Sequence, residues 1–165
     1  GPNEYYCKLC EPGTYSGAGQ GTCTECEKGK YAGGYEHVEC TSCDAGKSTA
    51  FGDRAVRDTD PATAGRRATS VSQCKTCEVG WVSSAGQPCR ICDAGKTSNS
   101  GAYANLKNPH TECVSCNAGY KSSAGGMCTP CDAGETSNSD HTDCKNCNPG
   151  TYSSISDGVW TTTDG

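Results

Sequence analysis

Residues 116–134 read CNAGYKSSAGGMCTPCDAG, a stretch with two CxxC pairs and very little apolar material. A glycine stands three residues after the second cysteine of each pair, at Gly119 and Gly134. Cysteines at this density either bind metal or form disulfides, and the glycines let the backbone turn around them. The stretch therefore predicts a unit that is held by crosslinks rather than by an apolar core.

The whole chain has the same character. Sixteen of its 165 residues are cysteine, only one is Phe, and the formal net charge is −5. So few large apolar side chains cannot build the core expected of a single domain of this length. The mild acidity argues against a nucleic-acid partner, because phosphate binding requires clustered Lys and Arg. No apolar run approaches the length of a membrane span, so we expect no membrane span in this segment.

One unit repeats along the chain, because every cysteine belongs to a CxxC pair that is followed by Asp, Glu or Asn, then any residue, then Gly. The pairs are Cys7/Cys10, Cys23/Cys26, Cys40/Cys43, Cys74/Cys77, Cys89/Cys92, Cys113/Cys116, Cys128/Cys131 and Cys144/Cys147. The turn glycines are Gly13, Gly29, Gly46, Gly80, Gly95, Gly119, Gly134 and Gly150.

We expect each turn glycine to have positive φ, and the acidic residue or Asn before it to cap the turn through its side-chain oxygen. An aromatic residue follows five of the glycines, and we expect it to lie over a neighbouring disulfide as part of the interior of its unit. These residues are Tyr15, Tyr31, Trp81, Tyr120 and Tyr152.

The predicted fold is a small, disulfide-rich and mostly irregular one with short β-hairpins and little or no helix. Contacts only between sequence neighbours would make it an elongated rod. We divide it into cysteine-rich repeats at 1–43, a repeat with a long inserted loop at 44–77, repeat pairs at 78–116 and 117–147, and the start of a further incomplete repeat at 148–165. Because this last stretch lacks a closing CxxC, we expect either a longer array or a last unit that is closed differently.

The cysteines could bind zinc or act as redox dithiols instead of forming structural disulfides. Tandem CxxC pairs approach zinc-ribbon spacing, and four thiolate tetrads would use all sixteen cysteines. A redox dithiol requires a βαβ fold that this sequence does not indicate. We expect disulfides at all sixteen cysteines and no metal, because the spacing between the pairs is too loose for a zinc array.

Two disulfide connectivities remain open, because sequence does not choose between them. A head-to-tail ladder, beginning with Cys10–Cys23 and Cys26–Cys40, leaves Cys7 and Cys147 over. The simplest pattern joins first to first and second to second cysteines of neighbouring pairs, as Cys7–Cys23, Cys10–Cys26, Cys40–Cys74, Cys43–Cys77, Cys89–Cys113, Cys92–Cys116, Cys128–Cys144 and Cys131–Cys147.

The segment between Cys43 and Cys74 is longer than the other segments between CxxC pairs. It contains four arginines, at Arg54, Arg57, Arg66 and Arg67. We expect a long exposed loop, and the alternative is a loop that binds a partner.

The three histidines precede a first cysteine by three residues and are each followed two residues later by an acid. These residues, His37, His110 and His141, could bind a divalent ion with that acid, but a turn in which the ring binds the backbone is the simpler interpretation. No catalytic constellation, phosphate loop or apolar pocket is indicated, so we expect neither an enzyme nor a cofactor.

The phrases CEPGTYSGAGQGTC (10–23) and CNPGTYSS (147–154) resemble the cysteine-rich repeats called ephrin-receptor-like, which are related to EGF, growth-factor-receptor and tumour-necrosis-factor-receptor modules. Phrases such as CDAGKTS (92–98) also resemble the immobilisation antigens and other surface proteins of ciliates and unicellular algae. The resemblance implies a disulfide-rich extracellular fold, while such repeats serve as spacers, coats and binding faces alike.

The sequence thus predicts an extracellular or cell-surface structural protein, part of a coat, appendage or fibre. Its expected partners are itself or other surface or matrix proteins, in a filament, and its Ser and Thr residues leave room for O-linked glycans. The alternative is a receptor ectodomain that binds a protein ligand through the 44–73 loop.

Overall fold

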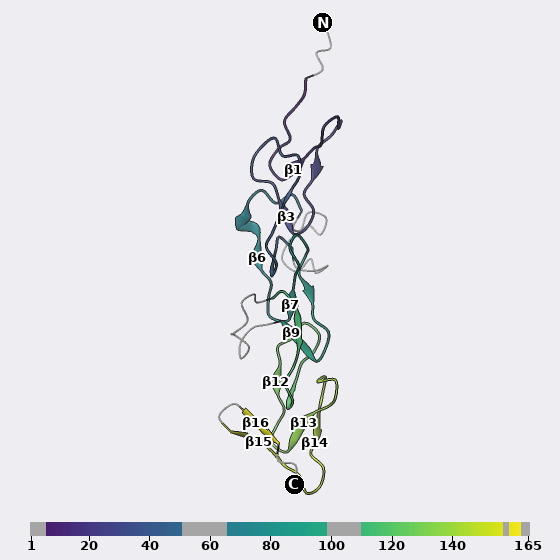
Figure 1. The fold of residues 1–165 in the computed structure, drawn as a ribbon, viewed down its shortest axis with the longest axis vertical. Helices are drawn as coiled ribbons and strands as arrows, with labels where there is room; N and C mark the ends of the chain where they lie inside the picture. Colours follow the sequence, from purple (N-terminus) through teal and green to yellow (C-terminus); the bar gives the residue numbers. More distant parts are fainter. Residues whose placement is uncertain (1–5, 51–65, 99–109, 157–158, 163–165) are drawn as a thin grey trace, which may run out of the picture. The chain divides into compact units, whose positions relative to one another are not determined.

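The computed structural model describes residues 6–50, 66–98, 110–156 and 159–162 (Figure 1). Its described part consists of short strands that pair as antiparallel two-stranded sheets, with one 3-10 turn as the helical element. This confirms the predicted class of small disulfide-rich repeats with short β-hairpins. The chain divides into two compact units, one formed by residues 1–76 with 83–89 and the other by residues 77–82 with 90–165.

The described residues of the first unit form three hairpins, each made of two-residue strands. Strand β1 (Thr14–Tyr15) pairs with β2 (Thr24–Glu25), and β3 (Lys30–Tyr31) pairs with β4 (Thr41–Ser42). The third pair is β5 (Lys47–Ser48) with β6 (Lys75–Thr76), which the 3-10 turn η1 (Val71–Gln73) precedes. Ser70 caps η1 by accepting the N–H of Ser72, and Gln73 completes the capping box.

Within its described residues the second unit contains five hairpins. The first three are β7 (Trp81–Val82) with β8 (Arg90–Ile91), β9 (Lys96–Ser98) with β10 (Cys113–Ser115), and β11 (Tyr120–Lys121) with β12 (Thr129–Pro130). The last two are β13 (Glu135–Ser137) with β14 (Cys144–Asn146), and β15 (Ser153–Ser156) with β16 (Val159–Thr162). Figure 1 draws β15 and β16 as a yellow hairpin beside β13 and β14, and Ser153 Oγ donates to the carbonyl of Glu135 at 2.6 Å.

Each hairpin begins in a β-turn that the repeated glycine makes possible. All eight turn glycines have φ between 78° and 86°, the region required at the third position of a type II turn. In every repeat the residue after the glycine donates its N–H to the backbone carbonyl of the Asp, Glu or Asn that starts the turn, as Lys96 does to Asp93 at 3.1 Å. The bond that closes the turn is thus a backbone one, and a side-chain cap in addition to it stays a prediction. The turn itself places the carbonyl for this bond, which leaves carboxylates such as that of Asp44 to pair with Lys47.

The disulfides form the head-to-tail ladder, and the simpler first-to-first pairing is wrong. Each bridge joins the second cysteine of one pair to the first cysteine of the next, because each hairpin folds the strand after a turn glycine back onto the following CxxC pair. The Cα atoms of bridged cysteines lie 5.6–5.7 Å apart, within the usual disulfide range. The bridges are Cys10–Cys23, Cys26–Cys40, Cys43–Cys74, Cys92–Cys113, Cys116–Cys128 and Cys131–Cys144.

Fourteen cysteines are disulfide-bonded in all, Cys77 and Cys89 among them. Cys7 and Cys147, the first and last of the chain, are free thiols in this structure. The expectation that all sixteen cysteines are bonded thus fails at these two positions, because a head-to-tail ladder leaves one unpaired cysteine at each end.

The interior consists of cysteines and small side chains. Besides the cysteines, the most buried positions are held by Ala, Ser, Thr and Val, for example Ala32, Ser48, Val82 and Ser98. The expected aromatic interior is not observed: Tyr15, Tyr31, Trp81 and Tyr120 are only half-buried, and Tyr152 is 61% exposed. The backbones approach too closely for a ring to fit between them, as the contacts between repeats show below.

Candidate functional site: the contacts between repeats

For this description a repeat is the stretch from the second cysteine of one pair to the first cysteine of the next. Repeats 1 to 7 are residues 10–23, 26–40, 43–74, 77–89, 92–113, 116–128 and 131–144, and repeat 8 begins at Cys147.

Each of the first seven turn glycines binds the repeat that follows it. Its N–H donates to the residue three positions after the next turn glycine, and two kinds of acceptor alternate along the chain. In the backbone kind the acceptor is a carbonyl: Gly13 to Ala32, Gly46 to Ser83, Gly95 to Ser122 and Gly134 to Ser153, over 2.8–3.3 Å. In the hydroxyl kind it is a side-chain oxygen: Gly29 to Thr49, Gly80 to Ser98 and Gly119 to Ser137, over 2.7–3.0 Å.

Serine makes the backbone kind of contact a two-point one. Ser83 Oγ donates to the carbonyl of Lys47 at 3.1 Å, and Ser122 Oγ donates to the carbonyl of Lys96 at 3.0 Å. Both serines are nearly inaccessible to solvent. A larger side chain at this position would separate the two backbones, so the position must stay small.

Histidine supports the hydroxyl kind of contact. The Nδ1 atom of His110 lies 3.1 Å from Ser98 Oγ, and that of His141 lies 3.1 Å from Ser137 Oγ. His37 differs, because its repeat has Ala32 in place of the serine. The backbone carbonyl of His37 accepts the N–H of Ser16. In the described ranges no three His, Cys, Asp or Glu side chains gather as a metal site.

A second set of contacts joins repeats 1, 2, 4 and 5 each to the next repeat but one. A Cβ atom added to Gly13 would meet the backbone of Arg67, and one added to Gly95 would meet the carbonyl of Asp140. Gly29 is covered in the same way by Gly86 and Gln87, and Gly80 by Gly125 and Gly126. The contacts therefore reach beyond the sequence neighbours to which we expected them to be confined.

The covering loops also bind the backbone between the two repeats. The N–H groups of Arg67, Gly86 and Gly125 donate to the carbonyls of Cys26, Cys43 and Cys92, over 2.9–3.0 Å. Gly13, Gly29, Gly80 and Gly95 are thus required twice, by their positive φ and by the close approach of a second backbone.

The arginine segment is only partly described. Arg54 and Arg57 lie outside the described residues, and Arg66 is exposed. Arg67 binds its own chain: its guanidinium lies 2.7 Å from the Glu11 carboxylate, and its backbone, at φ 58°, covers Gly13. The charge of Arg67 therefore already has a partner in its own chain.

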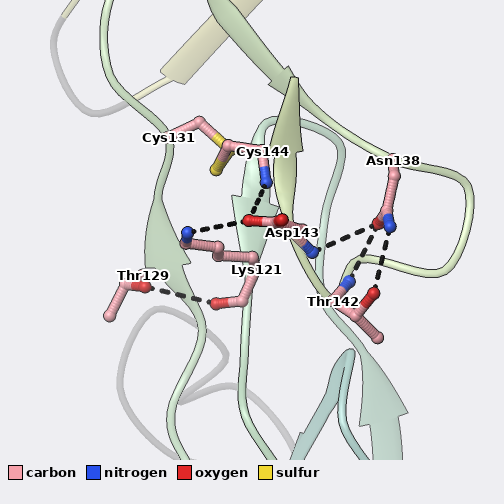
Figure 2. Close-up of polar contacts among 7 residues, drawn as sticks. All are labelled: Lys121, Thr129, Cys131, Asn138, Thr142, Asp143 and Cys144. Carbon is pink, nitrogen blue, oxygen red and sulfur yellow. Dashed lines mark hydrogen bonds and ion pairs between the residues drawn. A yellow bond between two sulfur atoms is a disulfide. The ribbon is translucent and has the colours of Figure 1, made fainter.

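A polar cluster joins repeats 6 and 7 (Figure 2). The Asp143 carboxylate accepts the N–H of Cys144 at 2.8 Å and lies 3.2 Å from Lys121 Nζ. Together the Cys144 N–H and the Lys121 ammonium hold the pKa of Asp143 below its ordinary value, the backbone bond having the larger effect. Asn138 Oδ1 accepts the N–H groups of Thr142 and Asp143, at 2.9 and 3.3 Å, and so fixes the turn that presents the carboxylate.

Sequence reasoning missed the position three residues after the turn glycine. A signal was available, because that position is small in every repeat: Ser16, Ala32, Thr49, Ser83, Ser98, Ser122, Ser137 and Ser153.

A family model described as tyrosine-protein kinase ephrin type A/B receptor-like matches residues 13–53, about a quarter of the chain. The matched family is a receptor-like cysteine-rich repeat rather than a catalytic one. No curated protein matches the chain. In the described ranges no helix has the length and apolar character needed to cross a membrane. The match marks residues 13–53 as similar to a receptor-like cysteine-rich repeat, and together with the disulfide ladder it points to an extracellular or cell-surface location.

Proposed function

We propose that this chain is an extracellular structural repeat protein, a disulfide-laddered segment of a surface coat, appendage or fibre. The observation that carries the proposal is the double connection of the repeats that contain Gly13, Gly29, Gly80 and Gly95. A turn glycine binds the next repeat through its N–H, and a loop of the next repeat but one covers it. Contacts of this kind transmit load along a chain without any large apolar core.

The crosslinks fit a load-bearing role. A disulfide that closes a loop of about fifteen residues stabilises a protein by roughly 3 kcal/mol, chiefly by constraining the unfolded chain. Local opening of one repeat therefore releases only the residues inside one bridge. The abundant exposed Ser and Thr would present a polar exterior and could accept O-linked sugar. The resemblance to the surface antigens of ciliates and algae agrees with this role and stays a prediction.

The test is the location of the natural protein. Antibodies against the described ranges should label the source cells densely and evenly along a coat, an appendage or a fibre in immuno-electron microscopy. The intact mass of the natural protein should contain increments of sugar if the exterior is O-glycosylated. Labelling of sparse, isolated particles in the cell membrane would contradict a structural role.

A receptor ectodomain is the second candidate, and the match to an ephrin-receptor-like family favours it. In this role the 44–73 segment would bind a protein ligand through its arginines. The variant Arg54→Ala/Arg57→Ala/Arg66→Ala should then lose binding to the source cells or their secretions, whereas Glu11→Gln, which alters only the partner of Arg67, should not. If the protein is structural, both variants should instead be found at the same place on the cell as the wild type.

A further inference from the structure

Tyr35 combines a highly exposed side chain with an acidic surrounding. It is 62% exposed and lies in the loop GGYEHVE, residues 33–39 of repeat 2. Two glutamates, Glu36 and Glu39, lie within four residues of it, and no Lys or Arg does. A phenol at the tip of an exposed loop is a group that an enzyme can reach and modify.

The loop is held at its base and open at its tip. At its start the N–H of Ala32 donates to the carbonyl of Ala68 at 3.0 Å, and at its end the Cys26–Cys40 bridge holds the chain. Within the described ranges no backbone N–H of residues 33–39 has a hydrogen-bond partner. An enzyme can therefore bind the tip without breaking a bond that these N–H groups donate.

The backbone turns sharply on either side of Tyr35. The φ angle is 136° at Gly34 and 67° at Glu36, and residues other than glycine rarely adopt such values. A Cβ atom added to Gly34 would lie 3.8 Å from Nε2 of His37, so the histidine ring folds back towards Gly34. The loop thus packs its histidine against its own backbone and leaves Tyr35 exposed.

The carboxylates beside Tyr35 are unpaired. Glu36 and Glu39 are both exposed, and neither takes part in an ion pair of the described residues. The field of an exposed charge extends over about one Debye length, roughly 8 Å in physiological salt. The loop that presents Tyr35 is therefore a negatively charged site.

Two other tyrosines lack this combination. Tyr31 is half-buried in strand β3, and the acid nearest to it in sequence, Glu27, pairs with Lys30 at 3.7 Å. Tyr152 is as exposed as Tyr35, at 61%, but has no acid within four residues. An enzyme that requires both exposure and free negative charge would distinguish Tyr35 from both of them.

A sulfotransferase is an enzyme of this kind. Its donor is a nucleotide phosphosulfate, whose phosphates require a cationic binding site, and such a site also attracts an acceptor with free carboxylates. The disulfide ladder places the chain in the oxidising secretory compartments rather than in the cytosol, where most tyrosine kinases act.

We propose that Tyr35 is a site of O-sulfation. The phenolic oxygen of Tyr35 forms a bond to the sulfur of the donor, and the bond from that sulfur to the bridging oxygen breaks. The nucleotide leaves with the bridging oxygen and the electron pair, and the phenolic proton is released. The sulfate adds a permanent negative charge to those of Glu36 and Glu39. The inference goes beyond the proposed function, because it applies equally to a coat protein and to a receptor.

Peptide mapping of the natural protein tests the proposal. Trypsin cleaves after Lys30 and Lys47, so one peptide contains both Tyr31 and Tyr35. After reduction and alkylation, this peptide should carry one sulfate, which electron-transfer fragmentation should assign to Tyr35. The group should resist alkaline phosphatase and be removed by mild acid. An unmodified peptide, a sulfate on Tyr31, or a group that the phosphatase removes would each overturn the proposal.

Variants of the full chain, secreted from cultured animal cells that are fed radiolabelled sulfate, test the reason for the choice of Tyr35. The label is counted in the 31–47 peptide alone, so that sulfate on sugars does not contribute. Tyr35→Phe should abolish the label, whereas Tyr31→Phe should keep it. Either the reverse pattern or an unlabelled wild type would overturn Tyr35 as the acceptor.

The acidic flank is tested in the same cells. Glu36→Gln/Glu39→Gln should lower the label about tenfold, because the charge that steers the loop to the enzyme is lost. Glu112→Gln is the matched control, since Glu112 is exposed and holds the position of Glu39 in repeat 5. Equal labelling of all three proteins would overturn the selection by charge. Wild-type melting temperatures should show that every variant is folded.

These outcomes do not depend on the proposed function. A dense coat or fibre without sulfate at Tyr35 would overturn the inference and leave the structural role standing. Scattered labelling of the cell membrane together with a sulfated Tyr35 would overturn the structural role and keep the modification.

Discussion

Ser98 Oγ lies 3.1 Å from Nδ1 of His110, and both residues are buried. The same hydroxyl oxygen accepts the N–H of Gly80 at 2.7 Å, so one side chain connects the turn of repeat 4 to the histidine of repeat 5. The Nδ1 atom also lies 3.3 Å from the carbonyl of Trp81. A buried group with this many polar neighbours is costly to remove, because each of them loses a partner in a place that water does not reach.

Ser98→Ala should therefore destabilise the chain by about 1–3 kcal/mol, the cost of leaving a buried donor without an acceptor. Ser84→Ala is the matched control, because Ser84 is exposed and its backbone carbonyl, which alanine keeps, makes its turn bond to Gln87. Guanidinium unfolding with the disulfides intact measures both. Equal stability of the two variants would show that the hydroxyl is not needed by Gly80.

Gly95→Ala should destabilise the chain more than Gly134→Ala. The two glycines have nearly the same φ, 79° and 84°, so the strain of placing alanine at positive φ, roughly 1 kcal/mol, is common to both. Only at Gly95 would the added Cβ collide with another backbone, that of Asp140, at a further cost of about 1–3 kcal/mol.

Thermal unfolding of the two glycine variants and the wild type separates these effects. The melting temperature should fall for both and fall clearly further for Gly95→Ala. Equal losses would mean that the loop at Asp140 moves aside without cost, and that covering a turn glycine does not hold the repeats together.

Removing the Cys43–Cys74 bridge should cost more than removing Cys10–Cys23. The two bridges span 31 and 13 residues, and the loop-entropy relation assigns them roughly 4 and 3 kcal/mol. The variants Cys43→Ser/Cys74→Ser and Cys10→Ser/Cys23→Ser are compared by their unfolding midpoints. A larger loss for the shorter loop would show that native packing, rather than the unfolded chain, sets the difference.

Peptide mapping tests the connectivity itself. After alkylation without reductant, only Cys7 and Cys147 of the monomer should be modified, and one proteolytic fragment should join Cys10 to Cys23. A fragment that joins Cys7 to Cys23 would restore the first-to-first pairing.

The repeated unit, with its bonded cysteines and turn glycine, was the part of this fold that sequence could predict best. Cysteine spacing and the glycine three residues later are properties of a single repeat, so Gly13 and Gly95 indicated their turns without any knowledge of neighbours. Connectivity was different, because both pairings suit the same spacing. Only the hairpin register, in which Cys113 lies opposite Ser98, places Cys92 beside Cys113.

The contacts between repeats were beyond single-repeat reasoning. Ser98 resembles any exposed loop serine in sequence, and it is buried where Gly80 of repeat 4 and His110 of its own repeat meet it. Arg67 stood out by its charge, yet its backbone is what covers Gly13. Such roles depend on a second and third repeat, and in the sequence only the constant small size of the position three residues after the turn glycine indicated them.

The stability that Asp143 contributes should depend on pH in the acidic range. The N–H of Cys144 and then Lys121 lower its pKa from the ordinary 3.8, so the folded chain binds the proton less readily than the unfolded chain does. The contribution is therefore fully present above pH 3.8 and is lost as the pH falls through the lower pKa of the folded state.

The melting temperatures of wild type and Asp143→Asn should thus differ at neutral pH and converge in strong acid. Adding Lys121→Met to both proteins should leave most of that difference in melting temperature in place. The backbone bond to Cys144 is the larger cause of the lowered pKa, and the exposed ion pair with Lys121 is screened by salt. A gap between wild type and Asp143→Asn that widens on acidification would have the wrong sign for a carboxylate held ionised by its partners. The turn at Asn138 and Thr142 would then have to stabilise this junction of repeats without the charge of Asp143.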